Sequence, residues 1–218
     1  DNVIKYLGPG LQLVSFDPKT SISMIGDGAL DSDEKIEIAA ELAAEDVAIF
    51  NQEACLASRF IFVEGDRSDV ETFCERLCER LAVERITASE YAMPLDIDTR
   101  EQIEMLQLMG DAQVWGRPDG RGMVLLTEEP VEFHPSNKTA NVVHVDSLES
   151  ALRYVTVATQ TIGMLPIERK RDLRDRLAAA GAQRIVVLGS AARHAQGGPH
   201  DAMFPLNRFV HWMADEYL

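Results

Sequence analysis

Short, continuously apolar segments alternate with amphipathic helix patterns along most of this 218-residue chain. The clearest are residues 59–63 (RFIFV) and 184–188 (RIVVL), in which nearly every side chain is apolar. A strand of this kind is buried on both faces, which happens when helices cover both sides of a parallel sheet. The sequence therefore predicts an α/β fold, a three-layer αβα domain with a mostly parallel sheet.

Apolar side chains three or four residues apart predict the helices, and apolar or β-branched runs predict the strands. We expect strands at 11–16, 21–25, 59–63, 112–115, 122–126, 141–145 and 184–188. We expect helices at 33–50, 68–82, 99–109, 147–162, 167–180 and 205–217. Ser32 or Asp33 can cap the first of these helices, and Gly181 is a usual helix stop.

The composition narrows the class of partner. The chain carries 36 acidic against 21 basic residues, a net charge of -15, which argues against a nucleic-acid or anionic-membrane partner because phosphate binding needs clustered Lys and Arg. The basic stretch 169–176 is interleaved with acids and is typical of a solvated helix face.

No apolar run approaches the roughly 18 residues of a membrane span, and three cysteines favour a reducing, cytoplasmic setting. The start at Asp1 leads us to expect a piece of a longer protein.

Two of the three cysteines fit a packing role. Cys74 and Cys78 lie four residues apart on one predicted helix, within or beside its apolar stripe. A structural metal site would need two more ligands at suitable spacing, and the sequence offers none nearby. We therefore expect both in the core and predict no metal site.

Cys55 stands apart, in a short gap between a helix pattern and a strand pattern. Its small neighbours Ala54 and Ala57 leave room for a substrate. A helical turn starting near Cys55 would direct backbone N–H groups at the sulfur, which favours the thiolate and suits an oxyanion. The residues alone leave two hypotheses open, a structural cysteine and a nucleophile.

The residues around Cys55 resemble a known nucleophile segment. Asn51-Gln52-x-x-Cys55, after a helix and before a buried strand, resembles the catalytic cysteine segment of the aldehyde dehydrogenase superfamily. Residues 16–21 resemble the Gly-Gly-Lys-Ser-Pro turn that precedes this cysteine there. Residues 132–135 (Glu-Phe-His-Pro) resemble the Glu-x-Phe-Gly-Pro segment of the superfamily.

Within that superfamily the resemblance is strongest to the acyl-CoA reductase branch, the LuxC-type fatty-acid reductases and their relatives. It is carried by residues 16–25, 46–65, 141–163 and 197–216. The resemblance implies a reductase that uses NADPH, with NADH as the alternative, and takes a CoA thioester or similar acyl-thioester donor. Such an enzyme forms an aldehyde through an acyl-enzyme on Cys55.

The resemblance also implies roles for other residues. Asn51 and Gln52 would orient the cysteine loop. Glu132, with Phe133 beside it, corresponds to the residue that hydrogen-bonds the nicotinamide ribose, although a solvated acid is the alternative. His200 would be a general base or a contact to CoA phosphate, although a His-Asp pair can equally be structural.

The chain departs from the superfamily pattern in several places. Ser15 or Phe16 stands where ordinary aldehyde dehydrogenases carry a glutamate that activates water, which fits an enzyme that must not hydrolyse its acyl-enzyme. Ala202 stands where glycine is expected. Members are much longer, and no G-x-G-x-x-G loop occurs here. We therefore expect residues 1–16 to end a mostly absent dinucleotide-binding domain and residues 17–218 to form the catalytic domain.

Three other interpretations remain. The first is a CoA-acylating aldehyde dehydrogenase that runs in the opposite direction. The second is a non-catalytic oligomerisation module without its cofactor domain. The third is an unrelated α/β domain in which Asn-Gln-x-x-Cys occurs by chance. Because superfamily members generally oligomerise, we also expect a homo-oligomer.

Overall fold

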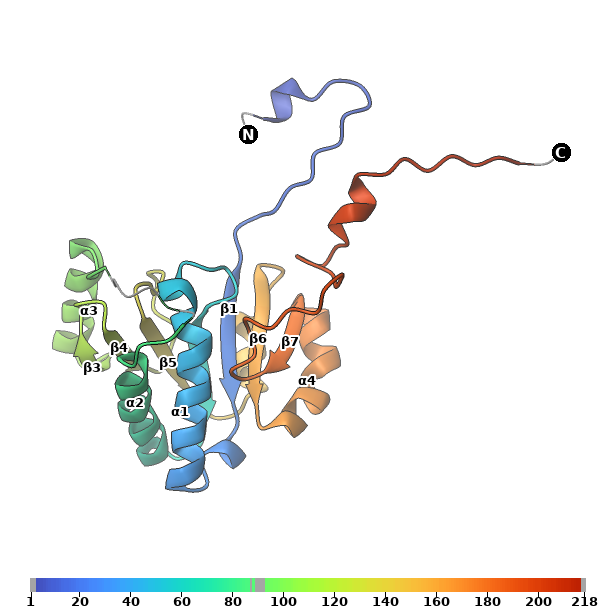
Figure 1. Cartoon of the computed structure of the whole chain (residues 1–218). Coiled ribbons are helices and arrows are strands. Elements are labelled where there is room, and N and C mark those ends of the chain that lie inside the picture. Colours follow the sequence, from blue (N-terminus) through green and yellow to red (C-terminus); the bar gives the residue numbers. More distant parts are fainter. Residues whose placement is uncertain (1–2, 87, 89–92, 217–218) are drawn as a thin grey trace.

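The computed structural model describes residues 3–86, 88 and 93–216, and its centre is a seven-stranded sheet in the order β3-β4-β5-β2-β1-β6-β7 (Figure 1). Neighbouring strands run parallel except β3 and β4. The strands are β1 (Thr20–Ile25), β2 (Ser58–Glu64), β3 (Gln113–Arg117), β4 (Gly122–Thr127), β5 (Thr139–Val145), β6 (Thr159–Leu165) and β7 (Arg184–Val187). The helices are α1 (Asp33–Ala48), α2 (Arg67–Leu81), α3 (Ile97–Met109) and α4 (Ile167–Ala180).

Helices cover both faces of this sheet, as the apolar strands predict. Helices α1 and α2 pack on one face, where they meet Ile61 and Val63 of β2. Phe62, between these two residues, points to the opposite face and packs in the cluster that contains α4. Helix α3 packs against β4 through Ile103 and Leu125 in a smaller cluster. The predicted three-layer αβα fold with a mostly parallel sheet is therefore confirmed.

Local signals fix where several elements begin and end. The Ser32 hydroxyl accepts a hydrogen bond from the Lys35 N–H at 3.4 Å and caps α1. Gly181 ends α4 in a left-handed conformation with φ 115°, and a Cβ there would approach the Val157 nitrogen to 2.6 Å. Only glycine fits that position without displacing the backbone.

The predicted helix at 147–162 is wrong. Only a single 3₁₀ segment, η4 (Ser150–Tyr154), forms there, and the chain then enters β6. The apolar spacing of the first part is real, since Leu148 and Ala151 are buried, but it covers less than two turns. Thr159 to Leu165 instead pairs with both β1 and β7, so sheet hydrogen bonds and full burial override the helical periodicity.

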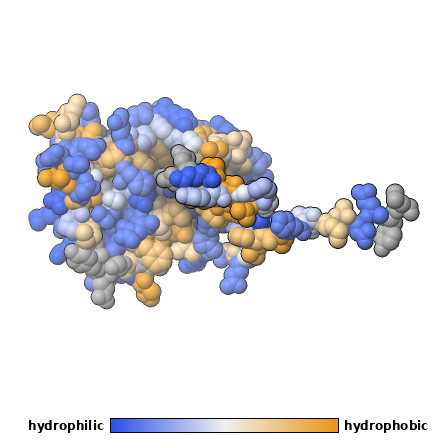
Figure 2. All heavy atoms as spheres, turned by 90° about the horizontal axis from the view of Figure 1, so that it is seen from above, coloured by the Kyte–Doolittle hydropathy of each residue, from blue (hydrophilic) through white to orange (hydrophobic). Residues whose placement is uncertain are grey.

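The two ends of the chain also differ from expectation. Residues 11–16 form no strand, and the helix expected at 205–217 is reduced to the 3₁₀ segment η5 (Pro205–Arg208), with Tyr217 outside the described residues. Both segments extend from the end of the sheet at which the parallel strands begin (Figure 1). Figure 2 looks down on that end of the domain. A strand needs a pairing partner and an amphipathic helix needs a surface to cover, and these segments have neither among the described residues.

Within the part of the chain that the structure describes, no helix is both long enough and apolar enough to cross a bilayer.

Candidate active site

Cys55 lies on a turn that strained backbone creates at the end of α1. Phe50, Asn51 and Gln52 follow the helix with φ values of 48°, 53° and 68°. The left-handed region is unfavourable for side chains other than those of Gly, Asn and Asp, so surrounding contacts must hold this segment in place. The reversal turns the chain away from α1 and leaves Cys55 exposed where β1 and β2 begin.

The turn is attached to the sheet by its backbone and its small side chains. The Ser21 hydroxyl of β1 donates to the Cys55 carbonyl at 2.8 Å, and the Ala57 N–H donates to the Ala54 carbonyl at 3.0 Å. Ala57 packs with Ile49 in a small buried cluster. The expectation of a helical turn starting near Cys55 is wrong, because the next regular element is β2 and residues 53–57 form turns only.

The buried side chain of Gln52 fixes the turn through hydrogen bonds to the sheet. Its side chain is 1% exposed, and its amide nitrogen donates to the Ser58 carbonyl at 3.0 Å and to the Thr139 carbonyl at 2.7 Å. Its amide oxygen accepts from the Thr139 N–H at 3.0 Å. Gln52 therefore joins the turn to the first residues of β2 and β5. Asn51 is buried beside it, and its predicted role stays a prediction.

Arg59 connects this turn to the segment that contains the other predicted residues. Its guanidinium donates to the Gln52 carbonyl and to the Pro135 carbonyl. Residues 128–138 run from the carboxyl end of β4 back to the amino end of β5, so their last part reaches the turn. Partial burial, and then the positive charge of Arg59, lower the pKa of His134 in this segment.

Sequence reasoning did not identify Arg59. The sequence does contain a sign of it, because Arg59 is the one basic residue of the run RFIFV. An arginine at the start of a strand is common, however, and is usually interpreted as a solvent-exposed strand end.

Glu132 and Phe133 line a cavity of about 840 Å³ between α3 and the segment after β4. Phe133 packs in the α3 cluster, whereas Glu132 is exposed. The cavity has the size of a typical small-molecule site. Its charged lining is Arg67, Asp111, Glu128, Glu129 and Glu132, and Arg67 is already paired with Glu128 at 2.6 Å. Carboxylates suit the hydroxyl groups of a ribose and repel phosphate.

His200 lies beside β6, at the end of the sheet where the parallel strands begin, which is also the end that carries Cys55. Its Nδ1 is 3.5 Å from the Asp201 carboxylate, which accepts a hydrogen bond from Gln160 of β6 at 2.7 Å. Ala202 has φ 58°, which explains why glycine is the residue expected there. The Phe16 ring meets the His200 ring edge to face at 5.7 Å. Among the described residues, no hydrogen bond joins His200 to Cys55.

The other two cysteines have the packing role predicted for them. Cys74 is fully buried, and Cys78 is half-buried with its Sγ 3.8 Å from the Gly122 carbonyl. Burial raises the pKa of both thiols. The described residues contain no cluster of three or more His, Cys, Asp or Glu arranged to hold a metal ion.

A comparison with protein families matches residues 3–212 to the family described as acyl-CoA reductase (LuxC). The chain belongs to this family. It is 28% identical over 219 residues to the long-chain acyl-protein thioester reductase of Vibrio harveyi, which covers 99% of this chain and 44% of the relative. It is 32% identical over 223 residues to the protein of the same name from Photorhabdus luminescens, again covering 98% of this chain and 44% of the relative. The chain thus spans less than half the length of these relatives.

Solved structures show the same fold. An NADP-dependent glyceraldehyde-3-phosphate dehydrogenase from Bacillus halodurans aligns with a TM-score of 0.54 and 13% identity, over 83% of this chain and 40% of that one. An NAD-dependent benzaldehyde dehydrogenase from Corynebacterium glutamicum aligns with a TM-score of 0.51 and 18% identity, over 76% and 39%. At such identities the likeness establishes the aldehyde dehydrogenase fold alone.

Proposed function

We propose that this chain carries the nucleophile of an NADPH-dependent reductase that converts a long-chain acyl thioester, such as an acyl-CoA or an acyl-protein, into an aldehyde. The observation that carries the proposal is the placement of Cys55. It is exposed on a turn that Ser21, Gln52 and Arg59 hold from three sides. The same arginine joins this turn to the segment that lines the large cavity.

The first step is acyl transfer to Cys55. The thiolate attacks the thioester carbonyl, the donor thiol leaves, and the new bond is again a thioester, so the exchange is close to balanced. The backbone N–H of Cys55 is the proposed donor to the oxyanion of the tetrahedral intermediate. Gln52, with Asn51 beside it, keeps the turn in the conformation that this attack requires.

We assign the nicotinamide riboside end of the cofactor to this cavity, because it has the size of a small-molecule site and Glu132 and Phe133 line it. When bound, NADPH, or NADH in its place, supplies the hydride. Glu132 would accept a hydrogen bond from a ribose hydroxyl, and Phe133 would provide an apolar wall. The three glutamates and Asp111 of the lining are unsuitable for the phosphates, which we therefore place outside this cavity.

After hydride transfer the thiohemiacetal on Cys55 collapses, the aldehyde leaves and the thiolate is restored. The acyl-enzyme must survive until then without hydrolysis. Ser15 and Phe16, where related dehydrogenases carry their water-activating glutamate, provide no general base for water.

The remaining assignments follow from position. We assign residues 17–218 to the catalytic domain and residues 1–16 to the end of a dinucleotide-binding domain. We assign His200, at the end of the sheet where the parallel strands begin, to contact the CoA phosphates or to act as a base. The exposed apolar residues of the terminal segments, among them Phe209 and Trp212, provide surface for another part of the protein or for a second copy in a homo-oligomer.

Intact mass after incubation with acyl-CoAs of different chain length tests this proposal. We expect one acyl group on the wild-type chain, mapped to Cys55, none on Cys55→Ala, and an unchanged adduct on Cys78→Ala. An adduct of equal rate on Cys55→Ala would overturn the assignment. Aldehyde formation after addition of NADPH would distinguish a complete catalytic unit from one that needs the other half.

A further inference from the structure

The loop that follows β7, residues 189–193, packs directly against the Cys55 turn. A small apolar cluster joins the two segments, and its members are Ile49, Ala54, Leu56, Ala57 and Ala191. Ala54 and Leu56 are the neighbours of Cys55 on either side in the chain. Ala191, which is 2% exposed, is the member that the loop contributes. The position of the loop therefore affects the position of the turn.

Asp46, in the last turn of α1, holds this loop by its backbone. Its carboxylate is 1% exposed, and each oxygen accepts a separate hydrogen bond at 2.9 Å, Oδ2 from the Gly189 N–H and Oδ1 from the Ala191 N–H. Arg184 of β7 donates to the Ala191 carbonyl at 2.8 Å. Both backbone polar groups of Ala191 are therefore bonded, which fixes the place where its side chain meets the turn.

The surroundings of Asp46 accommodate a carboxylate that the core itself does not need. A buried acid is costly for a fold, whereas an apolar side chain of similar size carries no such cost. The neighbouring strand leaves room for it, because a Cβ at Gly163 of β6 would lie 2.7 Å from Oδ2. Glycine inside a strand weakens that strand and often marks the close approach of another group. The group that approaches here is the carboxylate of Asp46.

We propose that Asp46 is a positioning residue, which fixes the Cys55 turn for acyl transfer by holding the 189–193 loop against it. The inference rests on the proposed function and deepens it, because it names a group that keeps the nucleophile in place. Attack on a thioester needs the sulfur and the oxyanion donor close to one productive geometry. A carboxylate offers one acceptor oxygen to each N–H, whereas an asparagine side chain would turn its NH₂ group towards one of them.

Two reactions of Cys55 in Asp46→Asn, followed by intact mass at pH 8 on the folded chain, test this proposal. Acylation by a long-chain acyl-CoA requires the geometry of the turn, and we expect it to be at least about tenfold slower than in wild type. Alkylation by iodoacetamide requires only an exposed thiol, and we expect it to stay within about threefold of wild type. Urea titration of each variant establishes that it is folded under the conditions of the assay.

Two further variants separate positioning from general stability. Leu177→Ala opens a space in the core between α4 and the opposite face of the sheet, so it lowers the stability of the fold and should leave both rates near those of wild type. Ala191→Gly keeps the backbone bonds to Asp46 and Arg184 but removes the methyl group that packs in the cluster, and it should slow acylation alone.

Three results would overturn the proposal. The first is acylation of Asp46→Asn at the wild-type rate. The second is an equal loss of acylation and alkylation in that variant, because a thiol that has become inaccessible is not a mispositioned one. The third is the same selective loss of acylation in Leu177→Ala, which would show that any weakening of the fold has this effect.

Hydrogen exchange measures the same contact without acyl transfer. The Ala57 N–H donates to the Ala54 carbonyl at 3.0 Å and reports on the turn. We expect this amide to exchange at least about tenfold faster in Asp46→Asn than in wild type, and at the wild-type rate in Leu177→Ala. Unchanged exchange in Asp46→Asn contradicts the inference. A wild-type chain that takes no acyl group would remove the proposed function, and the exchange rates would still decide whether Asp46 holds the turn. Acylation that does not depend on Asp46 would leave the proposed function standing and remove this inference.

Discussion

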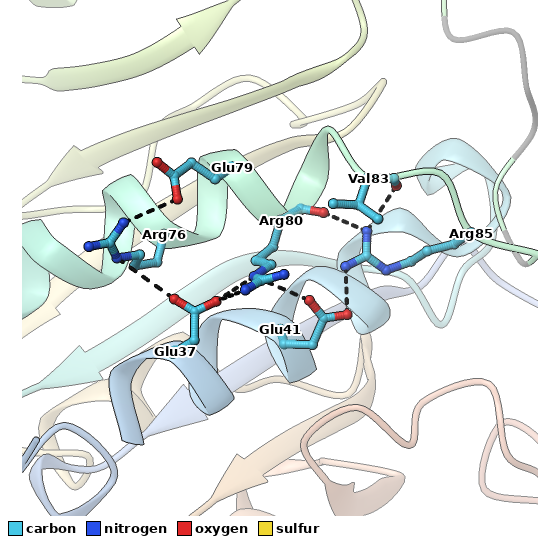
Figure 3. A network of polar contacts seen from close by, with 7 residues as sticks. All are labelled: Glu37, Glu41, Arg76, Glu79, Arg80, Val83 and Arg85. Carbon is cyan, nitrogen blue, oxygen red and sulfur yellow. Dashed lines mark hydrogen bonds and ion pairs between the residues drawn. The ribbon is translucent and has the colours of Figure 1, made fainter. Parts of the chain in front are cut away.

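The α1–α2 surface and the Cys55 turn both use arginine, in opposite surroundings. On the α1–α2 surface the charges form a chain of pairs between two exposed helix faces (Figure 3). Its members are Glu37 and Glu41 on α1, Arg76, Glu79 and Arg80 on α2, and Arg85, which follows α2 and has a side chain only 9% exposed. Each cation has at least one carboxylate partner, for example Arg76 with Glu37 at 3.7 Å and Arg80 with Glu41 at 3.5 Å.

At the Cys55 turn the single guanidinium of Arg59 is buried and donates hydrogen bonds to the backbone carbonyls of Gln52 and Pro135. The difference teaches where charge contributes to structure and where it contributes to chemistry. Exposed pairs each add little to stability and are screened by salt. A buried charge without a carboxylate partner is stabilised only by what the site itself provides, and such groups concentrate at functional sites.

The largest stability effect should come from the buried network of the turn. Gln52→Ala removes three hydrogen bonds and leaves the Thr139 N–H, the Thr139 carbonyl and the Ser58 carbonyl without this partner. We expect a loss of about 3 kcal/mol in the free energy of unfolding, measured by urea titration. Gln102→Ala, which removes one exposed contact of 3.3 Å to the Asp98 carbonyl, should change it by less than about 0.5 kcal/mol. Equal losses of stability for Gln52→Ala and Gln102→Ala would contradict the claim that the buried Gln52 side chain stabilises the turn.

Asp46 gives an intermediate case, a buried carboxylate near the guanidinium of Arg184. It accepts hydrogen bonds from the N–H groups of Gly189 and Ala191, both at 2.9 Å, and burial raises its pKa to about 6. The folded protein therefore holds this proton more tightly than the unfolded chain, in which the group has a pKa of 3.8. Its contribution to stability is greatest at and below pH 4 and falls as the pH rises towards 6.

Asp46→Asn removes this titration. We expect the stability difference between wild type and variant to change by about 2 to 3 kcal/mol between pH 4 and pH 7, in the direction that weakens wild type at higher pH. Urea titrations at several pH values measure it. Parallel pH curves for the two proteins would contradict the buried titration.

The smallest effect should come from the exposed network. Arg80→Gln removes the pairs with Glu37 and Glu41, whose side chains are more than one-third exposed. We expect a loss of about 0.5 to 1 kcal/mol at low salt that shrinks in 1 M NaCl. A large, salt-independent loss would erase the distinction between the two regions.

The sequence predicts most of the layers because local and tertiary signals agree there. The apolar run RFIFV predicts a buried strand whichever strands it pairs with. Gly181 predicts the end of α4, because glycine readily adopts the left-handed backbone found there. β6 was missed because the apolar spacing from Leu148 to Ile162 fits a helix, and only pairing with β1 and β7 decides otherwise. The terminal segments show the converse, because their apolar patterns have no surface to cover among the described residues.

The site was predictable only in part. The resemblance of its flanking residues pointed to Cys55, and the small residues around it suggested an open position. The left-handed backbone from Phe50 to Gln52 could not be predicted, because this segment contains no glycine, the residue that usually indicates positive φ. The contact between Arg59 and Pro135 joins residues 76 positions apart, so no local pattern contains it.

Central to this mechanism is that the fold keeps Cys55 accessible for acyl transfer and withdraws the other two cysteines from solvent. Alkylation rates of all three cysteines at pH 7, measured by mass spectrometry on the folded and on the urea-unfolded chain, test it most directly. We expect folding to leave Cys55 reactive and to slow Cys74 and Cys78, because the turn leaves Cys55 exposed whereas burial raises the pKa of the other two thiols. A Cys55 that folding slows as strongly as it slows Cys74 would contradict it.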